Sequence, residues 1–217
     1  MTLILISTTS PKTFSDVMRF TRDVVPFALS IILIGMIWNE HYVFFLRYGL
    51  RGTRVIVLNL LLLFIVLFYV YPLKFLTTML LLPVFYGITG NQEFLMELQG
   101  MIKGSDVSYL MMIYGFGAAS IFLVMQAMYR YAYKHREALE LNEIEKFDTQ
   151  TSIRGNMLLA SIPLLSALIA LFMIDYKWAG VYSGFIYFLY TPVMFFFYSR
   201  REKNRKRLLA QGHKAIN

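Results

Sequence analysis

Cysteine is absent from this 217-residue sequence, and charge is scarce, since Asp, Glu, Lys and Arg make up only 16% of it. Without cysteine there is no disulfide framework, no thiolate nucleophile and no thiolate ligand for a metal. A soluble domain of this size needs more charged surface, whereas here 58% of the residues are apolar. The composition therefore indicates a protein whose solvent is the lipid bilayer.

Linkers and enzyme motifs are also missing. No stretch rich in Pro, Gly or Ser divides the apolar runs, so we expect one transmembrane domain over residues 1–199 and a basic tail over 200–217. The sequence has no phosphate-binding glycine loop, no HExxH pair and no nucleophile elbow. No two of its three histidines, His41, His135 and His213, could ligate one metal or haem within a single span. We expect neither enzymatic activity nor a cofactor.

Five apolar runs are long enough to cross a hydrocarbon core of roughly 30 Å. They lie at about residues 24–45, 55–86, 109–129, 157–174 and 181–198. The fold class that they predict is an all-α integral membrane protein. Pro72 predicts a kink or a break within the second run. The charged segment 130–155 has apolar residues at helical spacing, and we expect it to extend the third span as a cytoplasmic helix.

Lysine and arginine are divided unequally between the two sides of these spans. Most of the 21 basic residues lie in the segments after the first and third full spans and in the tail. Basic short loops stay in the cytoplasm, so these three segments and the C-terminus are predicted to be cytoplasmic, in a cell (inner) membrane. The net charge of +8 is then explained by topology, and no nucleic-acid partner is expected.

The opening residues, MTLILIS, are too short to be a span. Six helical residues rise only about 9 Å. The orientation above places residues 8–23 outside, so we expect residues 1–7 to be the outer remnant of a sixth helix whose inner part would lie upstream of Met1. The alternative is a short tail lying at the outer surface.

Three polar or amphipathic side chains stand out within the apolar runs. Trp38 and His41 share a helical face, and Asn59 lies alone in a run of aliphatic residues. Asn59 is expected to enter from the same side and to find a partner in His41 or Trp38. His41 could titrate near neutral pH and gate a process, or it could hydrogen-bond a neighbouring helix and fix packing. The packing interpretation is favoured for both His41 and Asn59.

The motif IYGFG, at residues 113–117, is similar to the glycine-aromatic-glycine filter of the better-known potassium channels. Such a filter needs a full inner helix after it, and the apolar run after Gly117 ends at Arg130, which is too soon. We therefore interpret the glycines as small residues that allow helices to pack closely.

Residues 27–45 and 55–76 carry a resemblance to a known family. An apolar helix ending in Trp-x-x-His is followed by a basic linker, by Leu-Asn-Leu-Leu-Leu-Leu and by a proline, and residues 128–141 add the segment MYRYAYKHREALEL. This pattern resembles the bacterial members of the transmembrane protein 175 family, which are potassium-permeable channels. The Arg-x-x-x-Phe-Ser-Asp hallmark of that family is expected upstream of Met1, because the FSD at 14–16 falls on the predicted outer side.

The resemblance implies a homotetramer whose first helices surround a central pore for potassium, with a hydrophobic constriction. By the same resemblance Thr2 and Ile6 would line that pore, and Trp38, His41 and Asn59 would form a network that braces the pore helix. The alternatives are a small secondary transporter and a non-conducting membrane scaffold. A membrane enzyme using Glu40 and His41 is a third, and it would need a substrate-sized cavity around them.

Overall fold

The structure, a computed structural model, describes residues 13–102, 106–176 and 178–214, and its regular elements are all helices. The all-α prediction is therefore confirmed. Thr2, Ile6 and the rest of the opening fragment lie outside the described residues. The elements are α2 (Phe14–Tyr48), α3 (Thr53–Thr89), α4 (Glu93–Met101), α5 (Asp106–Lys134), α6 (Glu143–Phe172), α7 (Ala179–Phe185), a short 3-10 turn (Ile186–Leu189) and α8 (Tyr190–Lys214).

Five helical segments in the described part of the chain are long and apolar enough to cross a membrane. They are Thr21–Tyr48, Pro72–Thr89, Asp106–Lys134, Glu143–Phe172 and Ala179–Gln211. All but the second are longer than the predicted apolar runs, because charged and polar turns at their ends stay helical. The last of them continues through the basic residues after 199 without ending. In α3 the segment Pro72–Thr89 is long enough to cross, and Thr53–Tyr69 is a shorter apolar helix.

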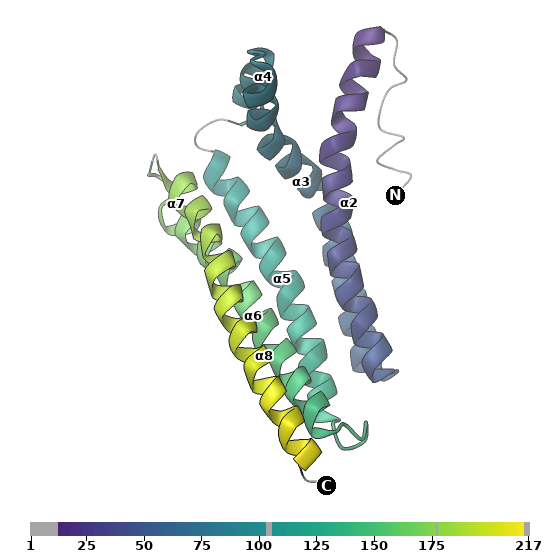
Figure 1. The fold of residues 1–217 in the computed structure, drawn as a ribbon. Coiled ribbons are helices and arrows are strands. Elements are labelled where there is room, and N and C mark those ends of the chain that lie inside the picture. The colour runs from purple at the N-terminus through teal and green to yellow at the C-terminus, as the bar shows by residue number, and fades with distance from the viewer. Residues whose placement is uncertain (1–12, 103–105, 177, 215–217) are drawn as a thin grey trace.

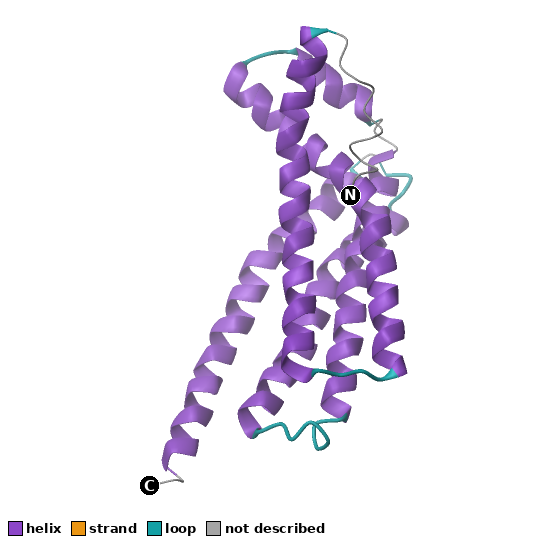
Figure 2. Cartoon of the chain, turned by 90° about the vertical axis from the view of Figure 1, so that its right-hand side faces the viewer, coloured by secondary structure: helices purple, strands orange, loops and turns teal. Residues whose placement is uncertain are grey.

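The helices form two groups that run roughly along one direction (Figure 1). α5 and α6 make the most extensive contact, with α7 and α8 packed against α6, and the second group is the antiparallel pair α2 and α3, joined to the first through α5. The α2–α3 connection, the α5–α6 loop and the C-terminus all lie at the lower end in both views (Figures 1 and 2). We call this the basic end, because the arginines and lysines of residues 47–54 and 130–154 gather there.

The structure bears on two expectations about the path of the chain. Of the kink or break predicted at Pro72, a break is absent, because α3 stays helical through that residue, and the upper part of α3 leans away from α2 toward α4 (Figure 1). The segment 130–155 is not one helical extension of the third span. α5 ends at Lys134, and α6 begins after Asn142, whose side chain accepts hydrogen bonds from the backbone N–H groups of Ile144 and Glu145. Glu145 accepts in return from the backbone N–H of Asn142, and this capping box starts a new helix.

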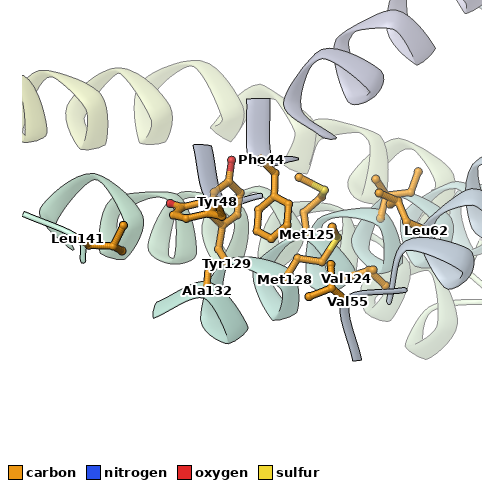
Figure 3. Packing of buried hydrophobic residues seen from close by; sticks show 11 residues of the cluster. Phe44, Tyr48, Val55, Leu62, Val124, Met125, Met128, Tyr129, Ala132 and Leu141 are labelled. Carbon is orange, nitrogen blue, oxygen red and sulfur yellow. The ribbon is translucent and has the colours of Figure 1, made fainter. Parts of the chain in front are cut away.

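The best-packed apolar cluster lies near the basic end, where α2 and α3 meet α5 (Figure 3). The Phe44 side chain is fully buried there, with its ring 5.2 Å from that of Tyr129 in an edge-to-face arrangement. Lipid tails are as apolar as these side chains, so close packing and not water exclusion holds such helices together. This cluster holds α2 and α3 against α5 at the basic end.

Candidate functional site

The predicted polar residues of α2 and α3 meet close to the basic end. His41 Nε2 lies 2.5 Å from Asn59 Oδ1, so the side chains join the two helices directly. An amide oxygen can only accept, and Nε2 of His41 must therefore carry the proton and donate it. The rings of Trp38 and Phe45 flank His41 at 5.0 Å and 4.9 Å, one turn of helix away on either side.

The structure thus brings His41 and Asn59 together and places Trp38 against His41. His41 is half-buried, whereas the Trp38 side chain is 58% exposed in the single chain. A wide aromatic surface on a spanning helix is free to contact lipid or another helix. The first helix that this network would brace lies outside the described residues. Its bracing role stays a prediction.

A second polar contact, between the outer halves of α2 and α3, was missed by the sequence analysis. The hydroxyls of Ser30 and Thr77 both donate to the carbonyl oxygen of Pro26, over 2.9 Å and 3.0 Å, and both side chains are buried. The two hydroxyls are also 3.0 Å apart. The available signal was the presence of hydroxyl side chains in apolar runs, at Ser30 and at the Thr77–Thr78 pair, since a buried polar group needs a partner. The α2–α3 pair is therefore fastened at two levels.

α3 is tied to α5 by a reciprocal pair of tyrosines. The Tyr69 hydroxyl donates to the backbone carbonyl of Tyr114 over 3.0 Å, and the Tyr114 hydroxyl donates to the backbone carbonyl of Pro72. Pro72 lacks a backbone N–H, so the carbonyl of Phe68, four residues earlier, loses its usual helical partner. The two tyrosine hydrogen bonds fasten α3 to α5 beside this interruption.

The glycines of the IYGFG motif lie in the middle of α5 and allow close packing. An added Cβ at Gly115 would lie 2.5 Å from the Pro163 carbonyl and 2.7 Å from the Ala167 Cβ of α6. An added Cβ at Gly117 would overlap the Tyr69 ring of α3. The packing interpretation is confirmed. A carbonyl filter is excluded because the motif is α-helical, with its carbonyls directed along the helix.

Charged side chains tie helices at both ends of the molecule. At the upper end, Arg22 of α2 pairs with Glu97 of α4 at 3.1 Å. At the basic end, Asp148 of α6 accepts from Arg201 at 2.8 Å and from Arg205 at 3.1 Å, so that α8 is held against the start of α6. The spanning helices are thus braced by ion pairs beyond their apolar middle parts.

Within residues 13–102, 106–176 and 178–214, no three His, Asp or Glu side chains come together as a metal site would require. A groove lies at the basic end between α3, α5 and α6, and its lining includes neither Glu40 nor His41. The expected absence of a cofactor stays an expectation.

Two known proteins are similar to this chain over most of its length, although no family model matches it. A potassium channel from Marivirga tractuosa is 46% identical over 213 residues, which are 96% of this chain and 85% of that protein. A crystal structure of a threonine-to-alanine variant of the potassium channel MtTMEM175, in complex with a Nanobody-MBP fusion protein, superposes with a TM-score of 0.77. The sequences are 44% identical, and the match covers 93% of this chain and 87% of that one.

Five membrane-length helices, with hydrogen bonds that join α2 to α3 and α3 to α5, define a multi-pass integral membrane protein. Identity and coverage of this extent then decide the family. The chain belongs to the bacterial TMEM175 family of potassium channels, as its sequence pattern indicated.

Proposed function

We propose that this chain is a subunit of a potassium-permeable ion channel. The observation that carries the proposal is its 46% identity, over nearly the whole chain, to a protein named a potassium channel. The fold supports it, because long apolar helices with internally satisfied polar groups can surround a conduit without exposing backbone to lipid. Potassium is then the permeant ion and not a bound cofactor.

The proposed pore lies on the axis of a homotetramer, with Thr2 and Ile6 of each subunit facing it. A ring of aliphatic side chains opposes ion passage by excluding water, and a ring of threonine hydroxyls replaces part of the hydration shell of the ion. The two positions are one helical turn apart, so one face of a helix presents both.

The α2–α3 contacts have a mechanical role in this proposal. A pore helix needs a firm outer wall if its side chains are to keep a narrow constriction. The His41–Asn59 and Ser30–Thr77–Pro26 contacts join α2 to α3, and the Tyr69–Tyr114 pair joins α3 to α5. This continuous support favours a wall built from α2 and α3, with Trp38 turned toward the first helix of its own or a neighbouring subunit.

The expected orientation places the spans in the cell (inner) membrane and the basic end and the C-terminus in the cytoplasm. The support is the positive-inside rule, since the arginine-rich and lysine-rich segments gather at one end of the helices (Figures 1 and 2).

Ion flux into liposomes tests the pore assignment. The full-length protein, with any residues that its coding sequence places before Met1, is purified and reconstituted in liposomes, and potassium and sodium fluxes are compared for the parent, for Thr2→Val and for the matched control Thr9→Val. Loss of a ring of hydroxyls at the constriction is expected to lower the potassium flux by about tenfold or more, because partly dehydrated ions lose a polar partner. Thr9→Val makes the same chemical change in the segment expected to lie outside, and it is expected to leave the flux unchanged.

The results also separate the other candidate classes. Equal flux and equal selectivity for Thr2→Val and the parent would contradict the pore assignment. Flux that saturates with potassium and stops without a second ion gradient would indicate a transporter, and no flux in the parent would indicate a scaffold. The native mass of the flux-competent assembly is expected to be that of four subunits.

A further inference from the structure

A groove of about 800 Å³ opens at the basic end, and no part of the proposed pore explains it. Its walls are the first two turns of α3, the last two turns of α5 and the third turn of α6. These three elements are far apart in the sequence, so the groove exists only in the folded chain.

Four cationic side chains line this groove. They are Arg54 from α3, Arg130 and Lys134 from α5, and Arg154 from α6. All four are exposed, no Asp or Glu belongs to the lining, and none of the four forms an ion pair with another side chain in the part of the chain that the structure describes. Like charges gathered around one space repel each other, and a bound anion relieves that repulsion. The charge pattern therefore selects an anionic ligand.

The floor of the groove is apolar, which narrows the chemistry of that ligand. Val57 and Leu58 of α3, Ala127 of α5 and Ile153 of α6 supply it. Val57 and Leu58 lie about one turn farther from the basic end than Arg54, and Ala127 about one turn farther than Arg130, whereas Ile153 is next to Arg154. A hydrated inorganic anion gains nothing from such a floor, whereas a ligand with a charged head and an acyl chain matches both parts of the groove.

Two tyrosines shape the wall between the rim and the floor. The Gln150 side chain donates to the Tyr133 hydroxyl at 2.5 Å, and the Tyr131 ring lies against the His135 ring, tilted by 40°, with 4.3 Å between the ring centres. An added Cβ on Gly52 would lie 3.0 Å from the Tyr131 hydroxyl, so the α2–α3 loop also packs closely against this wall. Tyrosine is the side chain favoured at the depth where head groups meet acyl chains. The groove is therefore formed before any ligand arrives.

We propose that this groove binds the phosphoryl head group of an anionic membrane lipid, with the phosphoryl oxygens on the four cations and an acyl chain along the apolar floor. Basic pockets between helices at the membrane surface recognise such head groups by charge and by hydrogen bonds to the phosphate oxygens. The lipid would add a contact between α3, α5 and α6 at the basic end. The proposal concerns binding and does not depend on ion conduction.

Lipid retention by the full chain tests this proposal. The protein is purified from mixed phosphatidylglycerol and phosphatidylcholine, and bound lipids are counted by native mass spectrometry over a range of phosphatidylglycerol concentrations. The variant is Arg130→Gln with Arg154→Gln. The matched control is Arg200→Gln with Arg207→Gln, which removes the same charge from exposed positions on α8 outside the groove.

The groove variant is expected to retain phosphatidylglycerol roughly tenfold less tightly than the parent, since each cation near an anionic head group contributes to binding. The control is expected to bind within about twofold of the parent, and phosphatidylcholine is expected to be retained poorly by all three proteins. A measurement of thermal stability with added phosphatidylglycerol gives an independent readout, and only the groove variant should lose the lipid-induced stabilisation.

Three results would overturn the proposal. Equal loss in both double variants would mean that the lipid responds to total charge. Displacement of phosphatidylglycerol by millimolar inorganic phosphate, with equal stabilisation by phosphate alone, would identify a site for a free anion. A smaller assembly mass for the groove variant, with lipid binding per subunit unchanged, would show that the four cations contact a neighbouring subunit.

Discussion

One hydrogen bond, from His41 to Asn59, carries a clear expectation for stability. Replacing Asn59 by Leu leaves the His41 N–H without an acceptor in an apolar seam. In a double-mutant cycle of Asn59→Leu and His41→Phe, we expect a coupling energy of about 1 kcal/mol or less, as for other hydrogen bonds between membrane helices. The measurement is reversible unfolding in mixed micelles.

Asn39→Leu provides the matched control for that cycle. It makes the same chemical change as Asn59→Leu, but at an exposed position of α2, the helix that carries His41. Its coupling with His41→Phe is expected to be near zero. A coupling as large as that of Asn59 would show that the seam does not depend on the His41–Asn59 contact.

Gly115 provides a second single-residue prediction. Gly115→Ala forces a Cβ to within 2.5 Å of the Pro163 carbonyl, between the two helices that share the largest contact. Overpacking of this kind is expected to cost about 1–3 kcal/mol of the free energy of unfolding. Gly35→Ala makes the same change in α2 with nothing within 4 Å, and there the better helix propensity of alanine should raise stability by up to about 1 kcal/mol. Melting temperatures in detergent test both, and a neutral Gly115→Ala would contradict the close α5–α6 packing.

α8 provides a prediction about a whole helix. Its basic second half is held on α6 mainly through Asp148, which accepts from Arg201 and Arg205. Asp148→Asn removes the charge that binds both guanidinium groups, and the pair is only partly exposed to water. We expect the loss to be about 1 kcal/mol and to appear as faster backbone hydrogen exchange and faster tryptic cleavage after residue 199.

Glu202→Gln is the control for Asp148, because Glu202 pairs only with exposed Lys206, at 3.6 Å, among the ion pairs found in the described ranges. Its effect on exchange is expected to be negligible. Similar exchange in Asp148→Asn and the parent would mean that the apolar first half of α8 alone positions the helix.

The natural absence of cysteine makes the orientation of the whole molecule directly testable. Single cysteines are introduced at Asn91, in the α3–α4 loop, and at Glu137, in the α5–α6 loop, both of which are exposed. On intact cells a membrane-impermeant maleimide is expected to label Asn91→Cys. Glu137→Cys should react only after the membrane is permeabilised, because basic loops stay in the cytoplasm. The opposite pattern would reverse the proposed topology.

Particular residues show how far sequence reasoning reaches for this protein. The apolar runs determined the helical class, because a backbone in lipid must satisfy its hydrogen bonds within each span. The pattern around Trp38, His41 and Asn59 indicated the family and a contact that the structure contains. Ser30, Thr77 and the Tyr69–Tyr114 pair were missed, because an isolated polar residue in a span says that a partner exists but not which helix supplies it.

The sequence by itself thus determined that the protein is surrounded by the lipid bilayer, that its spans are helical and that its basic segments share one end. Local composition is enough to decide each of these properties. Only the tertiary structure decided that α3 stays helical through Pro72, that segment 130–155 is divided by the Asn142 cap, and that four cations from three helices surround one groove. The physical reason is that these features depend on side chains up to about a hundred residues apart in the sequence, and only the packing of helices brings such side chains together.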